Sequence, residues 1–171
     1  MFFSCNDIDE ITENLYLGDL SGAENIEKLK LFDIKKVLSL LNGYFPQYKS
    51  SDNIIHKTLN VNDFDEENII KYFGECLNFI KGEEKILVHC AAGASRSATV
   101  VIAYIMWNKK MSFKEALEFV QNKRNIVCPN PGFKDQLELF EKELIKSNYD
   151  IDKIKFDEIK WEPKGNYDFD I

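Results

Sequence analysis

The apolar residues of this chain fall into short blocks separated by polar residues, glycine and proline. Four of these blocks have the length and composition of β-strands, namely residues 11–17, 34–41, 54–61 and 85–88. The last block is apolar after Lys85 and only a few residues long, which is typical of a strand buried on both faces. Together the four blocks predict the central sheet of the protein.

Helical periodicity occupies the segments between and after these strands. Residues 66–80 carry apolar positions three and four residues apart, and residues 98–107 are almost entirely apolar. Capping signals predict three more helices, with Ser21 opening residues 21–32, Ser112 opening a helix to about Lys123, and Asn130 followed by Pro131 opening the last. Strands alternating with helices, then consecutive helices, predict an α/β fold in which helices flank a mixed central β-sheet.

One segment carries most of the candidate chemistry. Residues 88–97 read Val-His-Cys-Ala-Ala-Gly-Ala-Ser-Arg-Ser and connect the apolar strand to the buried helix. A helix start presents free backbone N–H groups and partial positive charge, so this loop favours an anion such as phosphate. Gly93 adopts a positive φ angle at little cost, which lets successive N–H groups converge. The small side chains of the three alanines in the loop leave this backbone accessible.

The same loop holds a nucleophile and a cation. Cys90 lies at the focus of the positive potential, which favours its thiolate, and Arg96 offers a planar fork that matches two phosphate oxygens. The Ser97 hydroxyl can donate to the thiolate, and the His89 ring can fix the loop. The chemistry that follows is attack of Cys90 on phosphorus and hydrolysis of a phosphocysteine, which requires no metal and no other cofactor. The alternative is an inert buried cysteine before an ordinary turn.

The pattern His-Cys-x-x-Gly-x-Ser-Arg-Ser resembles the signature of the cysteine-dependent dual specificity protein phosphatases. The resemblance implies a protein-tyrosine-phosphatase-like fold, a nucleophilic Cys90, and a Ser97 that aids departure of the thiolate. It also implies that phosphate is bound by the loop residues Ala91, Ala92, Gly93, Ala94, Ser95 and Arg96.

The resemblance covers roughly residues 8–146 and includes Leu15-Tyr-Leu-Gly18 and Pro129-Asn-Pro-Gly-Phe133. We therefore divide the chain into a catalytic domain over 1–147 and an acidic, aromatic extension over 148–171. We expect a small form of the family without an amino-terminal docking domain. The aromatic residues of the extension are expected to pack on the domain, and docking of a partner is the alternative.

Cleavage of a phosphate ester also needs an acid that protonates the leaving oxygen. The resemblance places this acid on a loop after a strand, and Asp63 occupies the matching position after strand 54–61. Asp65 is the alternative acid, although it directly precedes the helix predicted over 66–80 and is expected to be its N-cap.

The resemblance further implies a shallow pocket that accepts phosphotyrosine and phosphoserine or phosphothreonine in proteins. Neither the Trp-Pro-Asp acid loop nor the extra tyrosine loop of tyrosine-specific relatives is present. Lipid-directed relatives carry lysines in the loop where Ala91, Ala92 and Ala94 stand here, which disfavours an inositol polyphosphate. A non-protein phosphate ester stays an alternative substrate. A catalytically inactive phosphoprotein-binding module is disfavoured because Cys90 and Arg96 are both present.

The net charge and the cysteines limit which partners and which cellular compartment we expect. The net charge of −7 disfavours nucleic acid and anionic membranes as partners. A reactive thiolate needs a reducing compartment, so we expect a cytoplasmic protein, with the nucleus as the alternative, and a monomer that acts on phosphorylated proteins. The four cysteines lack metal-ligand spacing.

Two further features allow a functional and an ordinary interpretation. Lys123 and Arg124 could bind a second phosphate, but we favour the interpretation that they complement the dipole of the preceding helix. Cys76 or Cys128 could form a protective disulfide with Cys90, and the favoured alternative is that each is simply buried.

Overall fold

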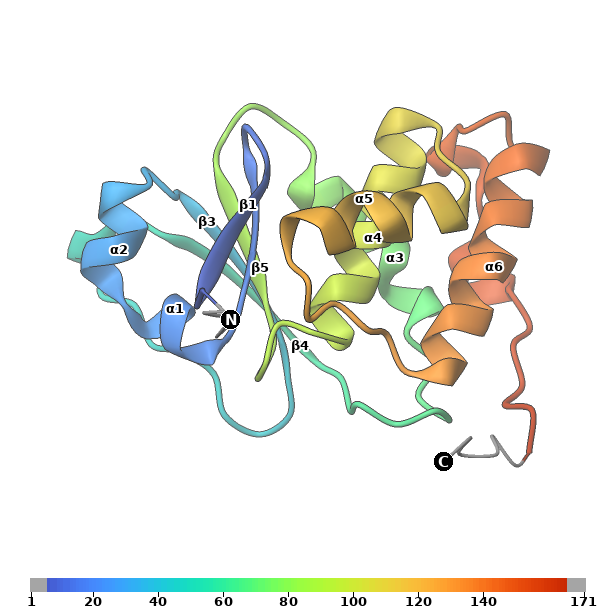
Figure 1. The fold of residues 1–171 in the computed structure, drawn as a ribbon, viewed down its shortest axis with the longest axis horizontal. Helices are drawn as coiled ribbons and strands as arrows, with labels where there is room; N and C mark the ends of the chain where they lie inside the picture. Colours follow the sequence, from blue (N-terminus) through green and yellow to red (C-terminus); the bar gives the residue numbers. More distant parts are fainter. Residues whose placement is uncertain (1–5, 166–171) are drawn as a thin grey trace.

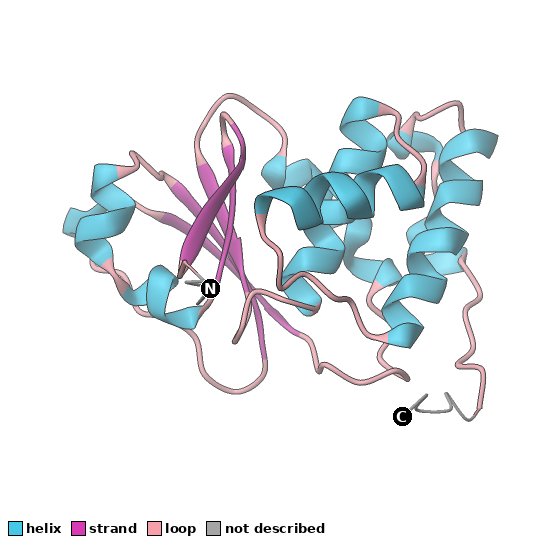
Figure 2. Ribbon diagram, in the orientation of Figure 1, coloured by secondary structure: helices cyan, strands magenta, loops and turns pink. Residues whose placement is uncertain are grey.

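The computed structural model describes residues 6–165, and its centre is a five-stranded mixed sheet with helices on both faces (Figures 1 and 2). The strands are β1 (Ile8–Thr12), β2 (Leu15–Gly18), β3 (Lys36–Leu41), β4 (Ile55–Asn60) and β5 (Ile86–His89). They lie in the order β1-β2-β5-β3-β4, with β1 antiparallel to β2 and every other neighbouring pair parallel. The prediction of a mixed, helix-flanked α/β sheet is confirmed.

The helices divide unequally between the two faces of the sheet (Figure 1). One face is covered by α1 (Leu20–Glu24) and α2 (Ile26–Leu31), and the other by α3 (Phe73–Ile80), α4 (Arg96–Lys109), α5 (Phe113–Lys123) and α6 (Pro131–Lys146). Each face of the sheet covers a hydrophobic core, and strand β5 contributes side chains to both cores. It can do so because successive side chains of a strand point to opposite faces. Leu87 packs with the smaller cluster around α1 and α2, whereas Ile86 and Val88 pack into the larger one.

Helix α4 is the element around which the larger core is built. It contacts β5, α3, α5 and α6, and its residues Ser97–Val101 are fully buried. Because both β5 and α4 are fixed in the interior, the loop that joins them has two immobile ends.

The single first strand predicted over 11–17 is wrong. The chain instead forms the hairpin β1–β2, with Glu13 and Asn14 in the turn. Two consecutive polar residues within an apolar block favour such a turn, and the pairing shifts register between Glu10 and Thr12.

The single helix predicted over 21–32 is also wrong, since the segment forms α1 and α2. The N-cap of α1 is Asp19, whose carboxylate accepts from the Gly22 amide, so the capping box predicted at Ser21 does not form. Asn25 ends the first helix and caps the second by accepting from the Lys28 amide. The capping box at Ser112 and the Asn130 cap with Pro131 at the first position are confirmed.

The helix predicted over 66–80 begins later than expected. Residues 66–69 are not helical, a 3₁₀ turn covers Ile70–Tyr72, and α3 starts at Phe73. Asp65 therefore caps no helix, and that prediction is wrong. The reason is tertiary, because the Gln136 side chain accepts from the Ile70 amide and donates to the Glu67 carbonyl.

The chain after α6 folds back over the helices (Figure 1). Ile151 and Ile154 are buried in the larger core, and the Phe156 ring lies 6.0 Å from the Phe140 ring. The Trp107 indole donates to the Tyr149 carbonyl at 3.1 Å. Aromatic packing of the extension is thus confirmed for Tyr149 and Phe156. Tyr167 and Phe169 lie outside the described residues.

Within residues 6–165, no helix combines the length and the apolar character that crossing a bilayer requires.

The burial of residues 151 and 154 in the extension leads to a prediction about stability. Ile151→Ala removes a side chain that is 6% exposed, so we expect the free energy of unfolding to fall by about 2–5 kcal/mol. Denaturant unfolding measures this change. Ile145→Ala on α6, where the side chain is 62% exposed, is the matched control and should change stability by less than about 0.5 kcal/mol. Equal losses in both variants would contradict a buried extension.

Candidate active site

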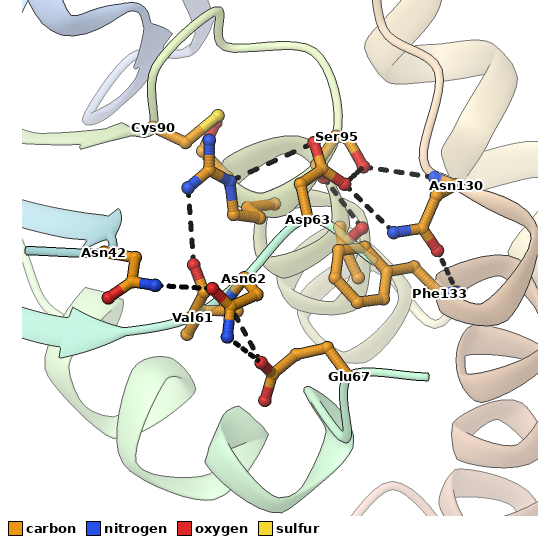
Figure 3. Close-up of polar contacts among 12 residues, drawn as sticks. Asn42, Val61, Asn62, Asp63, Glu67, Cys90, Ser95, Asn130 and Phe133 are labelled. Atoms are coloured by element: carbon orange, nitrogen blue, oxygen red, sulfur yellow. Dashed lines mark hydrogen bonds and ion pairs between the residues drawn. The ribbon is translucent and has the colours of Figure 1, made fainter. Parts of the chain in front are cut away.

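The candidate site lies at the carboxyl edge of the parallel strands, where ligands of α/β sheets bind. Strand β5 ends at His89 and delivers Cys90 into the loop of residues 90–96, which leads directly into α4. Strand β4 ends at Asn60 and delivers the segment 61–67 to the same edge, which we call the acid segment. Figure 3 shows the side chains of these two segments facing one another.

Gly93 gives the loop its curvature. Its φ angle is +67°, as predicted, and a Cβ atom there would lie 2.4 Å from the Gly18 carbonyl oxygen. Any larger residue would therefore strain the backbone and collide with β2. The loop can pass this close to the sheet only with glycine at this position.

Two donors converge on the sulfur of Cys90. The Gly93 amide donates to Sγ at 3.3 Å and the Ser97 hydroxyl donates to it at 3.1 Å. Cys90 is 1% exposed and precedes the first residue of the fourteen-residue helix α4 by six positions. Two hydrogen bonds and a nearby helix N-terminus are the surroundings that stabilise negative charge on sulfur.

Arg96, the last residue of the loop, contacts the acid segment at two points. Its Nη1 donates to the Val61 carbonyl at 3.3 Å, and its Nε stands 4.0 Å from Asp63 Oδ2. Among the described residues, Nε is buried and has no hydrogen-bond partner. A partly buried guanidinium with an unused, buried Nε donor has the capacity to bind an anion placed at the loop.

Asp63 is the carboxylate that the fold brings to the loop. Its Oδ1 accepts from the Ser95 hydroxyl at 2.7 Å and from the Asn130 amide nitrogen at 2.9 Å (Figure 3). The Asn130 backbone amide in turn donates to the Ser95 hydroxyl at 3.1 Å. Asp65 has a different place, since its backbone carbonyl packs against Gly132 so closely that a Cβ atom there would lie 1.9 Å away.

Sequence reasoning missed the role of two residues that hold the acid segment. Asn130 was predicted only as the cap of α6, a role it fills by accepting from the Phe133 amide, yet its amide group also binds Asp63. Glu67 accepts from both the backbone and side-chain amides of Asn62 at 3.1 Å. The resemblance of residues 129–133 to the phosphatase family was a signal that could have drawn attention to Asn130. No local sequence pattern marks Glu67.

His89 is held in one tautomer by its two neighbours. Its Nδ1 lies 3.1 Å from the Cys90 carbonyl, which can only accept, so Nδ1 carries the proton. Its Nε2 then accepts from the Ser39 hydroxyl at 2.5 Å, and Ser39 also contacts Nε2 of His56 at 2.7 Å. Burial lowers the pKa of His89 to about 4, so the ring is neutral near pH 7.

The basic pair before α6 does not form the second phosphate site considered above. Lys123 is an exposed basic residue in the last turn of α5, as the favoured interpretation predicts for it. Arg124 is instead 2% exposed, and its side chain donates to the Gly93 and Ala92 carbonyls.

The other two described cysteines are both free. Cys76 is fully buried in α3, where burial raises its pKa, and Cys128 is exposed, contrary to the expectation of burial. In the part of the chain that the structure describes, no three His, Cys, Asp or Glu side chains are grouped as metal ligands.

Similar sequences place the chain in a known family. Residues 15–143 match the family model described as dual specificity phosphatase, catalytic domain. The chain is 38% identical over 142 residues to dual specificity protein phosphatase 1B of Arabidopsis thaliana, which covers 81% of this chain and 84% of the relative. It is 35% identical over 131 residues to mouse dual specificity protein phosphatase 19, covering 74% and 59% of the two chains.

Two solved structures show the same fold, the first of them a human protein. A tyrosine phosphatase-like serine/threonine/tyrosine-interacting protein superimposes with a TM-score of 0.76 at 33% identity, over 81% of this chain and 97% of the other. The structure of DUSP15 superimposes with a TM-score of 0.73 at 31% identity, over 81% and 95%.

The burial of His89 leads to a prediction about how the stability of the protein depends on pH. In the folded protein the pKa of His89 is about 4, below the ordinary value of 6.5. The neutral His89 ring therefore stabilises the folded state above pH 6.5. That contribution is lost as the pH falls from 6.5 toward 4, and the thermal midpoint should fall over this range. Nuclear magnetic resonance of the two histidines should show a neutral His89 ring protonated at Nδ1 down to about pH 5. His89→Gln assigns the signals, and titration of the ring above pH 6 would contradict the prediction.

Proposed function

This chain belongs to the dual specificity phosphatase family and is a cysteine-dependent protein phosphatase, and we propose that it hydrolyses phosphotyrosine and phosphoserine or phosphothreonine through a phosphocysteine intermediate. The observation that carries the proposal is the convergence of the Gly93 amide and the Ser97 hydroxyl on Cys90 Sγ, beside a partly buried Arg96 whose buried Nε has no hydrogen-bond partner among the described residues.

In the first step, the Cys90 thiolate attacks phosphorus, so that an S–P bond forms as the P–O bond to the leaving group breaks. Arg96 and the amides of the loop hold the equatorial oxygens, where charge is stabilised through the transition state. The protonated Asp63 carboxyl gives its proton to the leaving oxygen. The closeness of Asp63 to the loop, where it accepts from the Ser95 hydroxyl, supports this role.

In the second step, a water molecule attacks the phosphocysteine, and Asp63, now a carboxylate, takes the proton from that water. The S–P bond breaks, inorganic phosphate is released, and the electron pair returns to Cys90 as a thiolate. The Ser97 hydroxyl, 3.1 Å from Sγ, stabilises the departing thiolate by its hydrogen bond. His89 supports the loop through the Cys90 carbonyl.

Phosphorylated proteins are the substrate class that the loop favours. Ala91 and Ala92 are exposed and Ala94 is half-buried, so the loop itself presents no charged side chain other than Arg96. The described relatives are named as dual specificity protein phosphatases, which supports the same class.

Two alternatives have less support. A PTPMT1 structure in complex with PI(5)P shares the fold at 18% identity, which does not extend its ligand to this chain. An inactive binding module is disfavoured by the intact arrangement of Cys90, Arg96 and Asp63. We further propose a monomer that acts in the cytoplasm, with the nucleus as the alternative compartment.

The mechanism predicts the behaviour of three variants. Cys90→Ser should abolish hydrolysis of p-nitrophenyl phosphate, and Asp63→Asn should lower kcat by about 10²-fold because the proton donor is lost. Asp65→Asn is the matched control and should stay within about 3-fold of the unchanged enzyme. Residual turnover in Cys90→Ser would refute the covalent step. A full rate in Asp63→Asn with a loss in Asp65→Asn would move the acid to Asp65.

The substrate proposal predicts activity on phosphopeptides of both kinds. Peptides of one sequence that carry phosphotyrosine or phosphothreonine should both release phosphate, and Asp63→Asn should slow the phosphothreonine peptide more. The reason is that an alkoxide leaving group needs the proton more than a phenolate does. Phosphate release from free inositol phosphates but from neither peptide would favour the non-protein alternative.

A further inference from the structure

The carbonyl groups of the loop all point away from the space where an anion would bind. Each carbonyl oxygen from Cys90 to Ser95 accepts a hydrogen bond from a group outside the loop. The donors are the His89 ring for Cys90, the Leu20 amide for Ala91, the Arg124 side chain for Ala92 and Gly93, the Cys128 amide for Ala94 and the Thr99 amide for Ser95.

One side chain, Arg124, thus holds the two central carbonyls. Its Nε donates to the Gly93 oxygen at 2.9 Å and its Nη2 donates to the Ala92 oxygen at 3.1 Å. Its Nη1 donates to Asp9 Oδ2 at 2.7 Å and to the Asn6 carbonyl at 2.6 Å. The guanidinium therefore ties the back of the loop to the amino-terminal strand β1.

Holding a carbonyl also orients the next amide. In a planar trans peptide, the C=O of one residue and the N–H of the next point in opposite directions. The contacts of Arg124 with the Ala92 and Gly93 carbonyls thus turn the amides of Gly93 and Ala94 toward the interior of the loop. The Gly93 amide does point there, since it donates to Cys90 Sγ at 3.3 Å.

We propose that Arg124 is a positioning residue that keeps the loop in its anion-binding shape by holding these two carbonyls. The proposal rests on the function proposed above, because it concerns the same phosphate. Stability alone does not account for a buried guanidinium, since buried ion pairs are often replaceable by apolar residues without loss. The planar fork of arginine, in contrast, suits two adjacent carbonyls and a carboxylate at once.

The test measures anion affinity apart from catalysis. Calorimetric titration with tungstate, a phosphate analogue, should show binding to the unchanged protein that weakens about 10- to 100-fold in Arg124→Met. Arg124→Lys should lose part of the affinity, because an ammonium cannot span both carbonyls in the same plane. The kcat/KM for p-nitrophenyl phosphate should fall in the same order across the variants.

The matched control is Lys28→Met. Lys28 forms an ion pair with Asp7, just before the same strand β1, but has no contact with the loop among the described residues. This variant should lose stability without losing tungstate affinity. Thermal midpoints are recorded for all variants, so that affinity is compared only among folded proteins, and Arg124→Lys carries the test if Arg124→Met does not fold.

The proposal is overturned if folded Arg124→Met binds tungstate as the unchanged protein does. It is also overturned if Lys28→Met loses as much affinity as Arg124→Met, because the effect would then come from β1 as a whole. If the unchanged protein binds tungstate but hydrolyses no phosphopeptide, the proposed function fails while the titration still decides the role of Arg124.

Discussion

The turn of the backbone between β5 and α4 is the constraint on which the site depends. Both elements are fixed in the core, so the chain must reverse within residues 90–95 while its amides face inward and its carbonyls face outward. Gly93 makes the turn sterically feasible. The outward carbonyls then need donors, and the fold supplies them from five places: His89 of β5, the start of α1, the end of α5, the segment before α6, and α4 itself.

The chemistry of the loop could be predicted because it is local in sequence. Cys90, Arg96 and Ser97 lie within eight residues, so their types and spacing are enough to predict an anion site with a nucleophile. The location at a strand end followed with little ambiguity, because the apolar strand and the buried helix flank the loop directly.

What could not be predicted depends on contacts between distant residues. Asp63 binds Asn130, 67 positions away, and Gln136 rather than an N-cap decides where α3 begins. The burial of Arg124 depends on Asp9, 115 positions away. A helical period does show which face of residues 66–80 is apolar, but tertiary hydrogen bonds override its start. Similarly, Ser21 is a good capping residue that loses its role to the neighbouring Asp19.

The close approach of Gly132 to the Asp65 carbonyl joins the acid segment to the start of α6. The same helix carries Phe140, on which Phe156 of the extension packs. The family match ends at residue 143, yet the packed core continues to Ile159. The packed part of the chain therefore extends beyond the part that matches the family, and the additional residues pack on the helix whose N-cap residue, Asn130, binds Asp63.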